Sequence, residues 1–176
     1  IMNCRAEKIR VENGRVVQVT ASRSGETLEF APDVLLSSMP LKDLAAGMND
    51  IPASVSEIAA GLPYRDFVTV GLLVDRLNLK NETKLKTLNN IIPDCWIYVQ
   101  DSGVKLGRIQ IFNNWSPYLL RDPERSVWLG LEYFCREDDD CWNLSAELWK
   151  RKGISELVSM GVLSADAAVS DFHVEK

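Results

Sequence analysis

Residues 106–120, LGRIQIFNNWSPYLL, bring together side chains that are suited to holding a ligand. Arg108 and Gln110 alternate with two isoleucines, a spacing typical of a strand with one buried face. The guanidinium of an arginine is a planar fork that can bind a phosphate or a carboxylate through two hydrogen bonds. Two asparagines, a tryptophan and a Ser-Pro turn follow the strand pattern. The stretch is therefore either a ligand-facing segment or a strand that ends in a polar loop, with its asparagines capping the turn.

A second charged side chain, Glu132, lies in the middle of the apolar strand pattern LGLEYF. A carboxylate in a buried strand needs a partner, because an unpaired charge away from water is costly. Arg108 on a neighbouring strand is the natural partner, so we expect a structural ion pair in preference to a catalytic acid. Trp96 and Tyr98 share one face of the strand pattern CWIYVQ, where they either line a pocket or pack across the sheet.

Residue types that commonly carry catalysis or bind metals are few. His173 is the only histidine, and the sequence shows no evident acid partner that would make it a general base. The four cysteines are widely spaced and form no CxxC pair, so we predict no metal site and expect free thiols in a reducing cytosol. GxGxxG, P-loop, GxSxG and HExxH motifs do not occur. The sequence therefore names no catalytic residue.

The composition of the 176 residues is that of an ordinary globular protein, 46% hydrophobic and 26% charged, with a net charge of −5. This mild acidity argues against a nucleic-acid partner, since such proteins usually carry a basic surface. No apolar run approaches the roughly 20 residues that span a bilayer. The first ten residues also lack the apolar centre of a signal peptide. We therefore expect a cytoplasmic protein without a transmembrane segment, and the composition does not indicate an oligomeric state.

The first third of the chain has the pattern of β-structure followed by short helices. Alternating runs around Asn13-Gly14 and Ser24-Gly25 predict two β-hairpins. The continuous apolar run Val34–Leu36 predicts a strand that is buried on both faces, as in a parallel sheet. One short helix is expected after Pro40, and another is expected with Ser54 as its N-cap.

The remainder of the chain has the pattern of an antiparallel sheet with one long helix. Predicted strands cover residues 66–77, 95–100, 107–115, 126–134 and 169–176, with a turn at 101–103. A helix is expected from the N-cap Ser145 to Gly161, with either a kink at Gly153 or a division there into two consecutive segments. The fold class is therefore α+β, a mainly antiparallel sheet with few helices, and a domain break is expected near residues 62–65.

The segment at 11–44, VENGRVVQVTASRSGETLEFAPDVLLSSMPLKDL, resembles part of the flavin-containing amine oxidases and their relatives. This superfamily includes protoporphyrinogen oxidase, phytoene desaturase and UDP-galactopyranose mutase. Its members commonly carry a hairpin, an apolar strand and an ST-x-P-L turn, which correspond here to Glu12–Val19, Asp33–Leu36 and Ser37–Leu41. GRIQIFNNWSP and LGLEYF are similar to substrate-domain strands of bacterial relatives near the galactopyranose mutases. The resemblance covers about residues 9–173.

The resemblance implies that residues 1–62 belong to an FAD-binding, Rossmann-like domain and that 63–176 form a substrate-binding domain. It implies FAD as the cofactor of the complete protein, with Ser37, Ser38 and Pro40 close to it. It also implies a small-molecule substrate, an amine or a nucleotide-sugar. The residues expected to bind that substrate are Arg108, Gln110, Asn113, Asn114, Trp115 and Tyr98. The dinucleotide-binding fingerprint and the C-terminal flavin motif of the family do not occur, so we expect an internal fragment that holds FAD poorly and is inactive alone.

Three functions are compatible with these observations. The first is an FAD-dependent oxidoreductase of the amine-oxidase type, of which this chain is chiefly the substrate-binding domain. The second is a mutase-like flavoenzyme that acts on a nucleotide-sugar in polysaccharide or lipopolysaccharide biosynthesis. The third is a binding module without catalytic activity. A flavin cofactor would separate the first two from the third, and tight binding of a uridine nucleotide would separate the second from the first.

Overall fold

The computed structural model describes residues 1–101 and 103–176, so Ser102, in the turn predicted at 101–103, lies outside the described residues. The chain divides into two compact units, unit 1 (Ile1–Tyr64) and unit 2 (Arg65–Lys176). Both combine antiparallel sheets with few helices, so the predicted α+β class is confirmed at that level. No helix in the described residues has the length and apolarity needed to cross a membrane.

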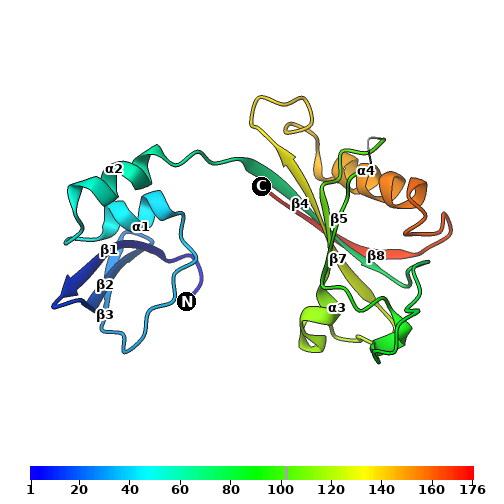
Figure 1. Cartoon of the computed structure of the whole chain (residues 1–176), viewed down its shortest axis with the longest axis horizontal. Coiled ribbons are helices and arrows are strands. Elements are labelled where there is room, and N and C mark those ends of the chain that lie inside the picture. Colours follow the sequence, from blue (N-terminus) through cyan, green and yellow to red (C-terminus); the bar gives the residue numbers. More distant parts are fainter. Residues whose placement is uncertain (102) are drawn as a thin grey trace. The chain divides into compact units, whose positions relative to one another are not determined.

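Unit 1 is built on a three-stranded antiparallel sheet in the order β1–β2–β3 (Figure 1). Its strands are β1 (Arg5–Glu12), β2 (Arg15–Arg23) and β3 (Glu26–Phe30). Both predicted hairpins are confirmed: Asn13 and Gly14 have φ angles of 50° and 75°, and Ser24 and Gly25 have 51° and 85°. Two successive residues with positive φ match the twist of the flanking strands, which explains the strength of these turn signals.

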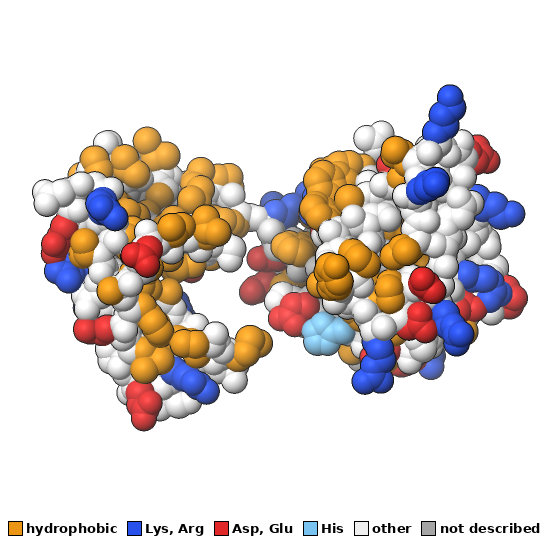
Figure 2. All heavy atoms as spheres, turned by 90° about the horizontal axis from the view of Figure 1, so that it is seen from below, with side chains coloured by type: hydrophobic (Ala, Val, Ile, Leu, Met, Phe, Trp, Pro, Cys, Tyr) orange, Lys and Arg blue, Asp and Glu red, His pale blue; other side chains and the backbone are white. Residues whose placement is uncertain are grey.

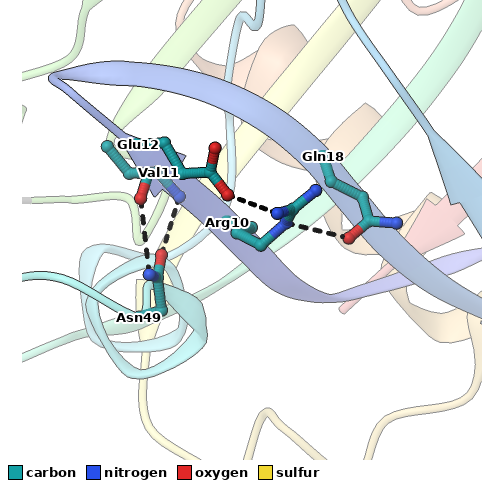
Figure 3. A network of polar contacts seen from close by, with 5 residues as sticks. All are labelled: Arg10, Val11, Glu12, Gln18 and Asn49. Atoms are coloured by element: carbon teal, nitrogen blue, oxygen red, sulfur yellow. Dashed lines mark hydrogen bonds and ion pairs between the residues drawn. The ribbon is translucent and has the colours of Figure 1, made fainter.

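A polar contact network fastens the chain after the first helix to the edge of the unit 1 sheet (Figure 3). The side chain of Asn49 accepts a hydrogen bond from the backbone N–H of Val11 at 2.7 Å and donates one to its carbonyl at 3.4 Å. On the exposed side of the same strand, Arg10 contacts Glu12 and Gln18. An asparagine can pair with an N–H and a C=O together, so here it replaces a strand neighbour.

Two short helices complete unit 1, α1 (Leu41–Gly47) and α2 (Ala53–Gly61). Pro40 and Pro52 are their N-cap residues. The prediction that Ser54 caps the second helix is wrong, because Ser54 lies within its first turn. A proline has a fixed φ that suits helix starts, and it outweighs the serine signal two residues later.

The predicted buried strand at Val34–Leu36 is also wrong. This segment forms no strand, and Val34 and Leu36 are 77% and 92% exposed. A continuous apolar run is buried in a sheet only where strands flank it and other elements cover both faces. None of the described residues provides such neighbours for the segment, so the Rossmann-like assignment is not supported here.

Unit 2 is a five-stranded antiparallel sheet in the order β5–β6–β7–β4–β8. Its strands are β4 (Asp66–Val74), β5 (Trp96–Tyr98), β6 (Arg108–Ile111), β7 (Val127–Cys135) and β8 (Val169–Glu175). The helix α4 (Ala146–Ser159) packs against one face of this sheet (Figure 1). The core between them consists of alternate residues of β4, β6 and β7, with Trp149 and Leu157 from α4. The other face of the sheet therefore carries the alternate set of side chains.

α4 is one continuous helix, and the predicted kink or division at Gly153 is wrong. The predicted N-cap is confirmed: the hydroxyl of Ser145 accepts the backbone N–H of Leu148 at 3.3 Å. Gly153 faces the sheet, where an added Cβ would lie 2.7 Å from Leu131 Cδ1. The glycine thus permits close packing of helix and sheet instead of interrupting the helix.

The strand that contains Arg108 is shorter than predicted. β6 ends at Ile111 and runs directly into the short helix α3 (Phe112–Trp115), followed by the 3-10 turn η2 (Pro117–Leu119). A second 3-10 turn, η1 (Leu88–Asn90), lies in the polar connection between β4 and β5. Ser116 caps η2 by accepting the backbone N–H of Tyr118. The asparagines of this stretch therefore belong to a helical turn and not to the strand.

Candidate functional site

The side of the five-stranded sheet opposite α4 holds several of the predicted site residues. We call it the open face, and its side chains come from β5, β6, β7, β4 and β8. Across the strands, Tyr98 lies opposite Arg108, Arg108 opposite Glu132, and Glu132 opposite Thr69. In the next row Trp96 lies opposite Gln110, which lies opposite Gly130. Directly opposed side chains on one face are close enough to interact.

The predicted pairing of Arg108 with Glu132 is confirmed. Arg108 Nε donates to Glu132 Oε2 at 2.7 Å, Nη2 also contacts Oε2, and the amide of Gln110 donates to Oε1. The Glu132 side chain is 3% exposed, whereas that of Arg108 is 29% exposed. Hydrogen bonding to Glu132 is the main reason that the pKa of Arg108 is raised above its ordinary value. Both carboxylate oxygens are thus engaged within the sheet, as expected for a structural pair.

Exposed aromatic rings border this ion pair. The guanidinium of Arg108 lies 5.7 Å from the ring centre of Tyr98, in cation–π contact. Trp96 and Trp115 place their ring centres 5.1 Å apart, and both side chains are about half exposed. Trp96 and Tyr98 therefore do share a face, and their rings are partly open to solvent. Such rings can contact the flat surface of a ligand.

Two glycines at the middle of the open face let further rings lie against the backbone. Gly71 of β4 is directly opposite Gly130 of β7. A Cβ on Gly71 would lie 2.9 Å from the ring of Trp128, and one on Gly130 would lie 2.9 Å from the ring of Phe112. These positions were not predicted as part of the site. Glycines inside strand patterns were the available signal, since they often mark a close approach by another group.

The side chains of Asn113 and Asn114 make contacts within the fold. Asn113 is buried; its amide donates to the carbonyl of Ser126 at 2.8 Å and its oxygen accepts the N–H of Trp128 at 3.0 Å. Asn114 donates to the carbonyls of Ile92 and Asp94 at 2.7 and 2.8 Å. Both amides thus hold α3 in place. Their assignment as substrate-binding residues stays a prediction, as does that of the other candidates on the open face.

His173 of β8 lies opposite Gly71, at the far side of the open face from Arg108. Its Nε2 is 3.1 Å from the carboxylate of Glu175, and both side chains are largely exposed. The expectation that His173 has no acid partner is therefore wrong: Glu175 is two residues further along the same strand, so both side chains lie on the same face. The arrangement is a surface contact whose strength depends on protonation of the histidine.

The predicted cofactor residues lie in unit 1, in the exposed segment between β3 and α1. Ser37 Oγ accepts the N–H of Met39 at 3.3 Å, which uses the hydroxyl locally. Pro40 lines a cavity of about 610 Å³ together with Arg5 and Asp43. The assignment of Ser37, Ser38 and Pro40 remains a prediction.

Comparison with known proteins places the fold. No protein-family model matches the chain, and no curated protein matches it. Among solved structures, reduced UDP-galactopyranose mutase matches 97% of this chain with a TM-score of 0.55 and 18% identity. An oxidoreductase from Methanosarcina mazei matches 97% with a TM-score of 0.50 and 12% identity. The likeness is one of fold.

The chain spans about a third of the length of these two structures, 33% of the first and 36% of the second. Both likenesses concern the fold, and the activities in the names of these two structures are said of those proteins.

Proposed function

We propose that this chain supplies the substrate-binding part of an FAD-dependent oxidoreductase of the amine-oxidase type, with the open face of the unit 2 sheet as the wall against which the substrate lies. The observation that carries the proposal is the composition of that face. It combines exposed aromatic rings with a buried, hydrogen-bonded ion pair on a rigid sheet, while α4 covers the opposite side. Rigid strands position binding residues more accurately than loops do.

In this proposal the protein residues bind and orient, and the flavin supplies the redox chemistry as the acceptor of hydride or electrons. Tyr98 and Trp96 offer ring surfaces to the substrate. Glu132, itself held by the amide of Gln110, fixes the guanidinium of Arg108 and leaves the outward edge of that guanidinium available. Residues 1–62 would belong to the FAD-binding domain, and the chain alone would be inactive.

A mutase acting on a nucleotide-sugar is the second candidate, and the fold of reduced UDP-galactopyranose mutase favours it. The charges of the open face favour the oxidoreductase. The positive charge of Arg108 is already balanced by Glu132, so it would bind a diphosphate less strongly than an unpaired arginine would.

The proposal is tested by the visible absorption spectrum of the whole protein that contains this chain. We expect flavin bands as purified or after addition of FAD, and weak binding of UDP. A colourless protein that takes up no FAD would contradict the enzyme proposal and favour a binding module. A yellow protein that binds UDP tightly would favour the mutase.

A further inference from the structure

Two of the four cysteines, Cys135 and Cys141, line the same cavity, which has a volume of about 330 Å³ and lies where β7 ends. Cys135 is the last residue of β7 and is 2% exposed, whereas Cys141 is partly exposed. Cys4 and Cys95 do not line this cavity. Cys135 belongs to the core on the α4 side of the sheet, so the proposed substrate face makes no use of this pair.

Two consecutive turns bring the chain at Cys141 back to the end of β7. The N–H of Asp139 donates to the carbonyl of Arg136 at 3.0 Å, and the N–H of Trp142 donates to the carbonyl of Asp139 at 2.9 Å. The carboxylate of Asp139 also accepts the N–H of Arg136 at 2.9 Å, which fixes the first turn. A turn of this kind keeps its first and fourth Cα atoms within about 7 Å of each other. The fold therefore holds Cys141 close to Cys135.

The two thiols of this pair have different surroundings. The thiol of Cys135 donates a hydrogen bond to the carbonyl of Tyr133 at 3.5 Å. Burial raises the pKa of this thiol, and the neighbouring thiol of Cys141 and the charge of Asp139 raise it further. Cys135 is thus a buried thiol that keeps its proton, and Cys141 is the thiol that a dissolved molecule reaches first.

We propose that Cys135 and Cys141 are a redox-active pair, which hydrogen peroxide converts to a disulfide and a dithiol converts back. The thiolate of Cys141 attacks one oxygen of the peroxide, the O–O bond breaks, hydroxide leaves and takes up a proton, and Cys141 becomes a sulfenic acid. The sulfur of Cys135 then attacks the sulfur of Cys141. The S–S bond forms, the S–O bond breaks, and the hydroxyl leaves with the proton of Cys135 as water. Two thiols are oxidised, and one peroxide is reduced to two molecules of water.

The lining of the cavity favours a small, neutral oxidant. Two carboxylates and two ammonium groups line it, those of Asp139, Asp140, Lys105 and Lys152. Opposite charges in equal number give a charged oxidant no net attraction. Hydrogen peroxide carries no charge and is little larger than water, so it can reach Cys141 there. A dithiol such as dithiothreitol reverses the reaction by thiol–disulfide exchange.

Peptide mapping tests the proposal directly, because trypsin cuts after Arg136, between the two cysteines. A disulfide would join the peptides 126–136 and 137–150, with the loss of two hydrogens. The chain is treated with one equivalent of hydrogen peroxide, its free thiols are blocked with N-ethylmaleimide, and the digest is examined by mass spectrometry. We expect the linked peptides as the main product from protein that stays monomeric on a non-reducing gel, and their loss after dithiothreitol. Blocked thiols at both positions, oxidation of Cys141 without linkage, or linkage of Cys141 to Cys4 or Cys95 would overturn the proposal.

Thermal unfolding of variants provides a second test. A disulfide restricts the unfolded chain, so peroxide should raise the unfolding midpoint of the unchanged chain by about 5 °C. Cys141→Ser, at a partly exposed position, should abolish this rise. Cys95→Ser is the matched control, since Cys95 is also partly exposed, and it should leave the rise intact. No rise in the unchanged chain, or an equal rise in Cys141→Ser, would contradict the pairing.

Discussion

Among the described residues, Glu132 has a charged side chain that is buried, and the side chain of its partner Arg108 is only partly exposed. Removing one member of such a pair leaves an uncompensated buried charge, which costs about 3–5 kcal/mol. Arg108→Glu should therefore lower the free energy of unfolding by at least this order, as measured by chemical denaturation. Adding Glu132→Arg should restore much of the loss, because the pair is rebuilt with reversed charges. No recovery in the double variant would contradict a pairwise interaction.

Arg76 provides the matched control for this prediction. It is paired with Asp75 and Asp166, but its side chain is 48% exposed. Exposed ion pairs contribute about 0–1 kcal/mol, so Arg76→Glu should change the free energy of unfolding far less than Arg108→Glu does. Similar losses at the two arginines would show that the burial of Glu132 is not the cause.

Burial also governs how the hydroxyl of Tyr133 and the thiol of Cys135 respond to alkaline pH. Burial, aided by the neighbouring Glu156, raises the pKa of Tyr133, and burial beside Cys141 and Asp139 raises the pKa of Cys135. Above their ordinary pKa values of 10.0 and 9.0, the unfolded chain loses these protons while the folded chain keeps them. The free energy of unfolding should therefore be undiminished below about pH 9 and fall as the pH rises further.

Denaturation curves between pH 7 and 11 measure this dependence. Above pH 9, the free energy of unfolding should fall less steeply with pH in the double variant Tyr133→Phe, Cys135→Ala than in the unchanged chain. The variant lacks the two groups that would lose a proton. An equal slope in the two proteins would mean that other groups cause the alkaline loss of stability.

At the scale of elements, the closeness of α4 to the sheet depends on Gly153. Replacing an interior helical glycine by alanine usually stabilises a helix by roughly 0.5–1 kcal/mol. Here the added Cβ would lie 2.7 Å from Leu131 Cδ1 in the packed core. Gly153→Ala should therefore destabilise unit 2, by about 1–3 kcal/mol, which is typical of overpacking.

Gly61, the last residue of α2, is the matched control for the helix prediction. An added Cβ there would meet no atom within 4 Å. Gly61→Ala should be neutral or slightly stabilising in the same thermal or chemical denaturation measurement. Stabilisation by both substitutions would contradict the packing role of Gly153.

Turns and helix ends that depend only on residues nearby in the sequence were predictable. The turns at Asn13-Gly14 and Ser24-Gly25 need only residues that tolerate positive φ, and the Ser145 cap needs only the next helical turn. The end of β6 was not predictable. It depends on Asn113 bonding to backbone groups at Ser126 and Trp128, which are distant in sequence.

Across the molecule, the main hydrophobic core belongs to unit 2, whereas unit 1 leaves much apolar surface exposed. All residues of that core lie between Val68 and Val174. In unit 1, hydrophobic side chains gather on the surface (Figure 2), and an apolar groove of about 270 Å³ runs between α1 and α2. The apolar run Val34–Leu36 was predicted to be a buried strand, but none of the described residues provides the neighbours that would bury it.

The candidate site was predictable only in part. The need of a carboxylate in a buried strand for a partner pointed from Glu132 to Arg108, and the structure pairs them. The sequence could not show that Gly71 faces Gly130, because strand order and register are set by the whole sheet. The rings of Phe112 and Trp128, which lie against these glycines, were missed for that reason.

The most direct test of the open face as the substrate wall is reduction of the flavin in the whole protein, mixed anaerobically with a series of amines. We compare Tyr98→Leu, on the open face, with Tyr118→Leu, the same change at a tyrosine of η2. For an amine that bleaches the flavin, we expect the concentration at half-maximal rate to rise about tenfold in Tyr98→Leu, as for loss of a stacked ring. Tyr118→Leu should leave it unchanged. Equal effects of the two variants, or no effect of Tyr98→Leu, would contradict a substrate role for the open face.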